Sequence, residues 1–73
     1  MISGGHAARV AWYFRVVELA DGRWACRHGL QQFDTHDELR HAVEHLRALA
    51  RAARPAELFL HRLDGNVERI GVV

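Results

Sequence analysis

The chain has 73 residues, of which 49% are hydrophobic and 26% are charged, a composition typical of globular proteins and not of disordered ones. Its length excludes a second domain, so we assign residues 9–73 to one α+β domain and residues 1–8 to a flexible amino-terminal tail. Ten arginines against nine acidic residues leave a net charge of +1, too small for the strong steering field of a dedicated nucleic-acid binder.

The sequence lacks the signatures of export and of membrane insertion. Its single cysteine, Cys26, has no second cysteine with which to form an internal disulfide, and residues 1–9 lack the apolar segment of a signal peptide. No stretch approaches the roughly 20 apolar residues of a membrane span. We therefore expect a cytoplasmic protein that does not bind membranes.

A first hairpin is predicted at the start of the domain. Residues 10–19 are rich in aromatic and β-branched residues, which favour a strand, and residues 23–28 form a shorter second strand. Residues 20–22 fit a three-residue loop whose final glycine adopts the left-handed conformation. This register places Val16 opposite Cys26.

A helix is predicted after the hairpin. Thr35 can accept a hydrogen bond from the amide of Glu38, and the Glu38 side chain can reach back to the Thr35 amide, which is the pattern of a capping box at a helix start. Pro55 disfavours helical geometry at Arg54 and ends the helix. Apolar residues recur between these limits at intervals of three and four, on one stripe: Leu39, Ala42, Val43, Leu46, Leu49, Ala50 and Ala53.

A second hairpin is predicted from residues 57–62 and 67–72, with a three-residue loop at 63–65 that also ends in Asp-Gly. The predicted fold class is therefore α+β, an antiparallel β-sheet of four strands in the order β-β-α-β-β with one helix packed on one face. Residues 31–33 can add a fifth strand.

The loop length decides which side chains share a face of the sheet, because a shift of one residue reverses every side chain. Two-residue loops would scatter charges into both apolar sets, so we adopt the three-residue loops. The face predicted to lie under the helix then carries Trp12, Phe14, Val16, Trp24, Cys26, Leu58, Leu60, Ile70 and Val72. The opposite face carries Tyr13, Arg15, Val17, Leu19, Ala25, Arg27, Phe59, His61, Val67 and Arg69.

This second face is half apolar, and the single helix is already used on the other side. Arg15 is predicted to lie opposite Arg27, where like charges are destabilising unless an anion or a stacked aromatic ring lies between them. Arginines among aromatic rings on an open sheet bind RNA in several domains, and the same mixture is favoured at protein interfaces. The candidate interface or nucleic-acid residues are Tyr13, Arg15, Val17, Arg27, Phe59, His61 and Arg69.

Two other groups of side chains are candidate sites of chemistry. His41 and His45 stand at i and i+4 on the predicted helix, a spacing at which two imidazoles can hold one metal ion, with Asp37 as a third candidate ligand. Two or three ligands make a poor metal site. We therefore expect these side chains to form a solvated helix face that does not bind zinc tightly. Cys26 points into the predicted core with no base beside it, and we expect a buried small hydrophobic residue and no nucleophile.

A basic run at the end of the helix, Arg47, Arg51 and Arg54, is favourable for helix-dipole reasons alone. The sequence shows no catalytic triad, carboxylate pair, phosphate-binding glycine loop or metal cluster. We therefore expect a small non-enzymatic module, without cofactor or metal, that forms a homodimer or higher oligomer through its open sheet face. Nucleic-acid binding by the same face is the alternative, and a role in binding a metal or small ligand is the third hypothesis.

Four motifs stand in order between about residue 12 and residue 70: Trp12, Asp21-Gly22-Arg23-Trp24-Ala25, Phe33-Asp34-Thr35 and Glu57-Leu58-Phe59-Leu60-His61-Arg62-Leu63-Asp64-Gly65. In order and spacing they resemble the bacterial family catalogued as domain of unknown function 2188. The resemblance implies a fold and a bacterial cytosol, and it brings no known activity or catalytic residues. A weaker similarity is to the amino-terminal half of antitoxin proteins of the Hic type, which also place a hairpin before a Thr-capped helix.

Overall fold

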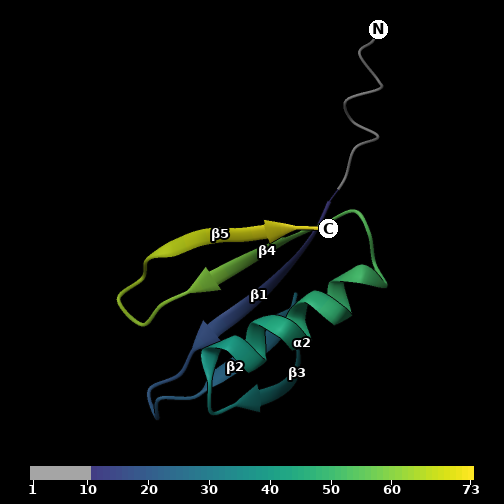
Figure 1. The fold of residues 1–73 in the computed structure, drawn as a ribbon. Coiled ribbons are helices and arrows are strands. Elements are labelled where there is room, and N and C mark those ends of the chain that lie inside the picture. Colours follow the sequence, from purple (N-terminus) through teal and green to yellow (C-terminus); the bar gives the residue numbers. More distant parts are fainter. Residues whose placement is uncertain (1–10) are drawn as a thin grey trace, which may run out of the picture.

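Five strands and one helix make up residues 11–73, the part of the chain that the computed structural model describes. The predicted tail at residues 1–8 lies outside the described residues. The elements in chain order (Figure 1) are β1 (Trp12–Glu18), β2 (Trp24–His28), β3 (Gln31–His36), α2 (Leu39–Arg51), β4 (Ala56–His61) and β5 (Val67–Val72). Between residues 11 and 73, no helix is long and apolar enough to cross a membrane.

The five strands form one mixed sheet in the order β3-β2-β1-β4-β5. The two predicted hairpins are present, but they meet through a parallel pairing of β1 with β4 at the centre of the sheet. The α+β class and the single helix are confirmed, and the prediction of an antiparallel sheet is wrong at this one pairing. Turn residues determine each hairpin locally, whereas the direction in which the hairpins meet depends on the path of the chain through α2, because parallel neighbours need a long crossover.

The fifth strand, β3, is longer than the optional strand in the sequence interpretation. It pairs antiparallel with β2, and the register shifts between Ala25 and Arg27. Ala25 lies opposite Thr35 and Arg27 lies opposite Gln32, so both Phe33 and Asp34 oppose the single residue Cys26. This is a β-bulge, a device that redirects side chains locally.

The predicted capping box at Thr35 is wrong. Thr35 belongs to β3, and its hydroxyl accepts a hydrogen bond from the guanidinium of Arg23 on the neighbouring strand. The helix begins at Leu39, and its N-cap residue, Glu38, makes no capping hydrogen bond with its side chain. Pairing in the sheet therefore overrides a local sequence signal that is favourable to a helix. The helix also ends before the predicted limit, at Arg51.

Both predicted three-residue turns are confirmed. In the first, the amide of Leu19 donates to the carbonyl of Arg23 at 2.8 Å, and Gly22 has a φ of 88°. In the second, the amide of Arg62 donates to the carbonyl of Asn66 at 2.9 Å. A three-residue hairpin loop of this type ends in a left-handed residue, which is why glycine occupies that position.

One side chain of the second hairpin lies on a different face from the prediction. Phe59 pairs with Arg69, but the next pair is Leu58 with Gly71, so Ile70 is an extra residue on β5. Beyond this bulge Val72 lies opposite Glu57 and is 61% exposed. The placement of Val72 on the face under the helix is therefore wrong, because a bulge reverses the alternation of side chains.

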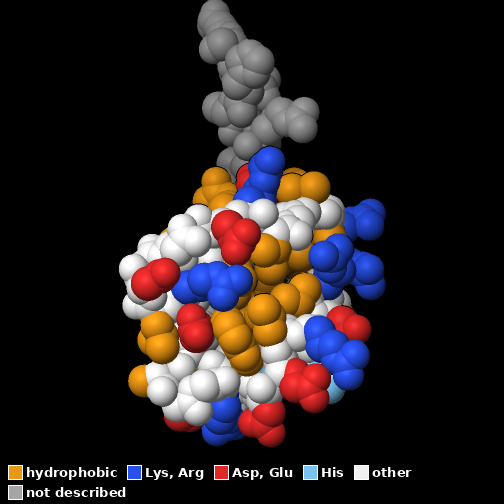
Figure 2. Space-filling view, turned by 60° about the vertical axis from the view of Figure 1, so that its left-hand side comes forward, with side chains coloured by type: hydrophobic (Ala, Val, Ile, Leu, Met, Phe, Trp, Pro, Cys, Tyr) orange, Lys and Arg blue, Asp and Glu red, His pale blue; other side chains and the backbone are white. Residues whose placement is uncertain are grey.

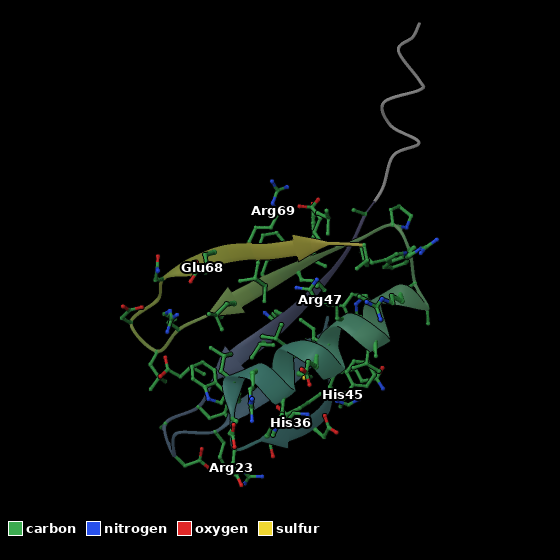
Figure 3. All side chains as sticks on the ribbon, in the orientation of Figure 1. Arg23, His36, His45, Arg47, Glu68 and Arg69 are labelled. Atoms are coloured by element: carbon green, nitrogen blue, oxygen red, sulfur yellow. The ribbon has the colours of Figure 1, made fainter. Side chains whose placement is uncertain are left out.

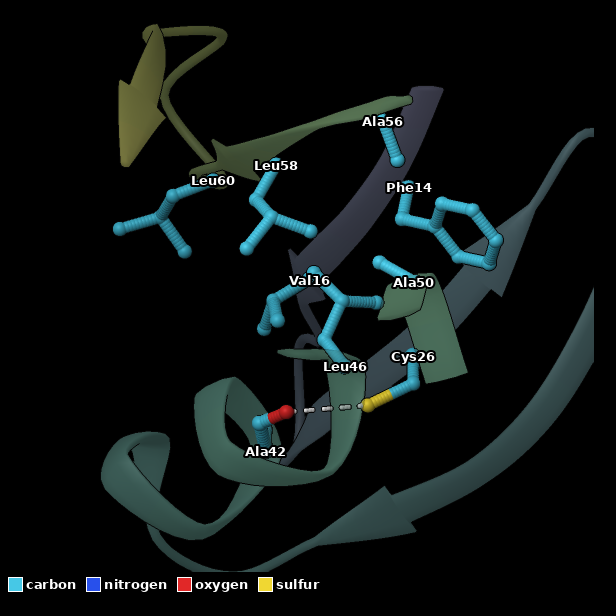
Figure 4. Close-up of a cluster of buried hydrophobic side chains, with 9 residues drawn as sticks. All are labelled: Phe14, Val16, Cys26, Ala42, Leu46, Ala50, Ala56, Leu58 and Leu60. Carbon is cyan, nitrogen blue, oxygen red and sulfur yellow. Dashed lines mark hydrogen bonds between the residues drawn. The ribbon is translucent and has the colours of Figure 1, made fainter. Parts of the chain in front are cut away.

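The core lies between α2 and the sheet, as the apolar stripe predicts (Figure 4). Ala42, Leu46 and Ala50 on α2 are fully buried, and the other residues of the stripe pack at the margin. The core residues from the sheet are Phe14, Val16, Cys26, Ala56, Leu58 and Leu60. Trp12 is an exception at 51% exposure, since it is the first residue of β1 and its indole packs on the His28 ring at the end of the sheet.

The helix packs on β1, β2, β3 and β4 and leaves β5 uncovered. Figure 2 shows hydrophobic side chains gathered in one patch in the middle of the view, with arginine, aspartate and glutamate side chains around it. Ile70 on β5 is one of the partly buried residues at the margin of the core. Arg47 of α2 extends its guanidinium toward β5 on the face of the sheet under the helix, close to Gly71.

Candidate functional site

The face of the sheet turned away from α2, here called the open face, carries all seven candidate residues from the sequence. Strand pairing places four of them in one row across the sheet, in the order Arg27, Arg15, Phe59 and Arg69. Val17 and His61 are paired in the next row, and Tyr13 lies opposite Glu57 on the other side. The structure therefore brings the seven residues together on one continuous surface.

The predicted juxtaposition of Arg15 and Arg27 is confirmed, since the two residues are direct partners across β1 and β2. Each guanidinium has its own neutral acceptor. Arg15 Nη2 donates to the carbonyl of Gly29 at 3.0 Å, and Arg27 Nε donates to the side-chain oxygen of Gln32 at 3.2 Å. The two guanidinium groups are thus directed toward different acceptors, while Arg15 Nε is buried and has no hydrogen-bond partner among the described residues.

A shallow, open groove of about 820 Å³ lies on the open face beside the turn between β2 and β3. Tyr13 and Phe59 line it, with their rings in an edge-to-face contact at 5.5 Å between centroids. Trp12 and the fully exposed Leu30 line its end, and Tyr13 is itself 61% exposed. The groove therefore presents large apolar side chains to solvent.

The charge at the edge of this surface is largely compensated. Arg69 Nη1 lies 3.2 Å from Glu57 Oε1, and both side chains belong to the neighbouring strands β4 and β5. Arg15, which lines the groove, is already hydrogen-bonded to Gly29. Arg15, Arg27 and Arg69 of the open face are thus each engaged by a neighbouring acceptor.

A second group of side chains lies on the opposite side of the sheet, at the edge of the core beside α2. Cys26, Asp34, His36 and His45, here called the Cys-Asp-His-His cluster, each bring one possible metal-ligand atom within 4.8 Å of the others. Figure 3 shows His36 on β3 and His45 on α2 as neighbours, and their ring centroids are 5.3 Å apart.

Three atoms of this cluster form a tight triangle. Asp34 Oδ1 lies 2.9 Å from His45 Nδ1 and 3.3 Å from His36 Nε2, and the two ring nitrogens are 3.2 Å apart. The Cys26 thiol lies behind them in the core and donates to the carbonyl of Ala42 at 3.3 Å (Figure 4). Burial, with a smaller contribution from the charge of Asp34, raises the pKa of Cys26 to about 11. The thiol is therefore neutral at physiological pH and is not a nucleophile.

The cluster is not the combination considered from the sequence. His41 is exposed, and Asp37 pairs with Arg23 at 3.5 Å, so neither residue belongs to it. Its sequence signal is the pair Asp34 and His36, which stand at i and i+2 and so share one face of a strand. That signal is readable only once residues 31–36 are recognised as a strand.

The comparison with protein families gives a match over residues 14–69, from β1 to β5, to the model of domain of unknown function 2188, described as an uncharacterized protein conserved in bacteria. The chain belongs to this family. The resemblance inferred from the turn motifs is thereby confirmed, and the matched segment contains the whole Cys-Asp-His-His cluster and most of the open face. No curated protein and no solved structure matches the chain.

Proposed function

We propose that this protein is a self-associating interaction module, a homodimer in which the open faces of two copies pack against one another. The observation that carries the proposal is the groove lined by exposed aromatic and aliphatic side chains, with Tyr13 and Phe59 on the open face and Trp12 and Leu30 at the end of the sheet. Apolar groups of this size on one continuous surface are typical of protein interfaces.

The row of side chains across the open face fits a second copy of the same chain. Gln32 and Arg27 lie on the β3 and β2 side of Arg15, and Phe59 and Arg69 lie on the other side. A twofold axis running along β1 turns one copy over and places Arg27 of one protomer above Phe59 of the other. The two copies of Arg15 then meet on the axis, where each guanidinium is directed aside toward the carbonyl of Gly29. An arginine over an aromatic face is a favourable cation–π pair, and a twofold axis forms it twice.

The area of the open face is also adequate for a dimer interface. Five strands about 4.8 Å apart and about six residues long, with a rise of about 3.3 Å per residue, give about 480 Å² of flat surface per copy. Side-chain relief adds to this figure, so two copies reach the total of about 1,000 Å² that a specific interface needs. Burial at the interface would also supplement the small core of a domain of this size.

The test is the mass of the protein at micromolar concentration, measured by light scattering after gel filtration. The wild type is expected at twice the monomer mass of 8.3 kDa. Tyr13→Glu places a charge in the groove and should give a monomer, whereas Leu63→Glu should leave the dimer intact. Leu63 is the matched control, since it is 61% exposed like Tyr13 but lies in the loop between β4 and β5.

Nucleic-acid binding is the second candidate function, and the row of Arg27, Arg15 and Phe59 is the observation that favours it. In that case a monomeric wild type should bind single-stranded RNA or DNA in a salt-dependent manner. Changing Arg15 and Arg27 together to Gln should then reduce the salt slope by roughly one unit per lost phosphate contact. A monomer that binds no nucleic acid in filter binding at two salt concentrations would contradict both functions.

A further inference from the structure

The Cys-Asp-His-His cluster brings together the donor atoms of a metal site from three elements of the fold. We infer that Cys26, Asp34, His36 and His45 bind one zinc ion. The cluster offers one sulfur, two imidazole nitrogens and one carboxylate oxygen. Zinc takes these three atom types in four-coordinate tetrahedral sites, and thiolate and imidazole ligands together favour zinc over calcium or magnesium.

The triangle of Asp34 Oδ1, His36 Nε2 and His45 Nδ1 already has the dimensions of one face of a zinc tetrahedron. Its edges are 2.9, 3.2 and 3.3 Å. For bonds of roughly 2.0–2.1 Å, a zinc tetrahedron has edges of roughly 3.3 Å. An ion at this bond length from all three atoms would lie about 1 Å above the plane of the triangle. These three ligands therefore need to move by only a few tenths of an ångström.

Cys26 supplies the fourth ligand from the core side. Its sulfur is within 4.8 Å of the other ligand atoms, and a zinc–sulfur bond of roughly 2.3 Å requires a separation of roughly 3.5 Å from each of them. Rotation of the side chain toward the triangle closes this difference, and it replaces the hydrogen bond to the Ala42 carbonyl by the bond to zinc. The thiol proton leaves to solvent as the thiolate binds the ion.

The fold holds these ligands on regular elements. Cys26 comes from β2, Asp34 and His36 from β3, and His45 from α2. The bulge in β3 sets Asp34 opposite Cys26, where a regular ladder would place a single residue. The Asp34 side chain is 49% exposed and that of His45 is 34% exposed, so the ion can enter from solvent. With four protein ligands the site is closed, and its role is to tie the edge strand β3 and α2 to the centre of the sheet.

The first test is calorimetric titration of the full chain with zinc chloride. The expected result is one zinc per chain with submicromolar affinity, and a higher midpoint of thermal unfolding in the presence of zinc. His45→Ala and Asp34→Ala should each weaken binding by at least about 100-fold, since loss even of groups that only orient ligands costs 10- to 100-fold. His41→Ala is the matched control, an exposed histidine on the same helix, and should bind as the wild type does.

Cobalt(II) tests the ligand set by spectroscopy. The wild type should show the visible absorption of tetrahedral cobalt and a thiolate-to-cobalt charge-transfer band, and Cys26→Ser should lose that band. Cys26 lies in the core, and Cys26→Ser can fail to fold for that reason alone. Asp34 is at the surface, so Asp34→Ala then still tests whether the cluster binds the metal. Only millimolar zinc binding by the folded wild type, an equal loss in His41→Ala, or a cobalt complex without a thiolate band would overturn the assignment.

Discussion

The turn between β4 and β5 allows a quantitative test of the hairpin geometry. Gly65 has a φ of 91°, and a Cβ atom built there would have no atom within 4 Å. The whole cost of Gly65→Val is therefore backbone strain, about 1–3 kcal/mol for a side chain held in this conformation. Valine also restricts the backbone of the unfolded chain more than glycine does, and this effect offsets about 0.4–1 kcal/mol of the strain. Because valine is β-branched, its strain lies toward the upper end of this range, and we expect a net loss of about 1–2 kcal/mol in the free energy of unfolding.

Thermal unfolding followed by circular dichroism measures this loss. For a domain of 60–100 residues, each 1 kcal/mol lowers the Tm by about 4–8 °C. Gly71→Ala is the control, because Gly71 has no left-handed φ and its new Cβ would lie 3.5 Å from both Arg47 Nη2 and Leu58 Cδ1, an ordinary contact distance. Its Tm should stay the same or rise. A Tm for Gly65→Val equal to that of the wild type would refute the left-handed glycine turn.

Two further predictions concern Cys26 and Thr35. Because burial raises the pKa of Cys26 from 9.0 to about 11, the folded protein holds this proton more tightly than the unfolded chain; stability should fall as the pH rises from 9 toward 11. Urea unfolding of the zinc-free protein across this range should show the fall, and Cys26→Ala should flatten it. Thr35→Val should cost less than about 0.5 kcal/mol in urea, since Thr35 is a strand residue with a partly exposed contact to Arg23. A loss of 1 kcal/mol or more would instead indicate a helix cap.

The parts of the fold that follow from local chemistry could be predicted from the sequence. Asp21-Gly22 and Asp64-Gly65 determine the turn type, and the turn type determines which residues face each other, as the pairing of Arg15 with Arg27 shows. The helical stripe likewise follows from spacing alone, because residues three and four apart share a helix face. These features need no information from distant parts of the chain.

The parts that depend on distant segments could not be predicted in this way. Residues 31–36 carry both a weak strand pattern and a capping-box pattern, and pairing with β2 decides between them. This choice also decides whether the Cys-Asp-His-His cluster can form, since Asp34 and His36 reach His45 only from β3. On the sequence alone His45 has His41 as its nearest candidate partner. The i, i+2 spacing of Asp34 and His36 indicates a shared face only once residues 31–36 are taken as a strand.

The parallel pairing of β1 with β4 has a consequence for how the chain folds. Each hairpin closes a short loop, but the central pair joins strands separated by residues 19–55, so it carries the largest loss of loop entropy. Non-local pairings of this kind slow folding. During synthesis, β1 lacks a neighbour on one side until the ribosome has released β4. We therefore expect the first three strands and α2 to remain incompletely folded until β4 pairs with β1 in the middle of the sheet.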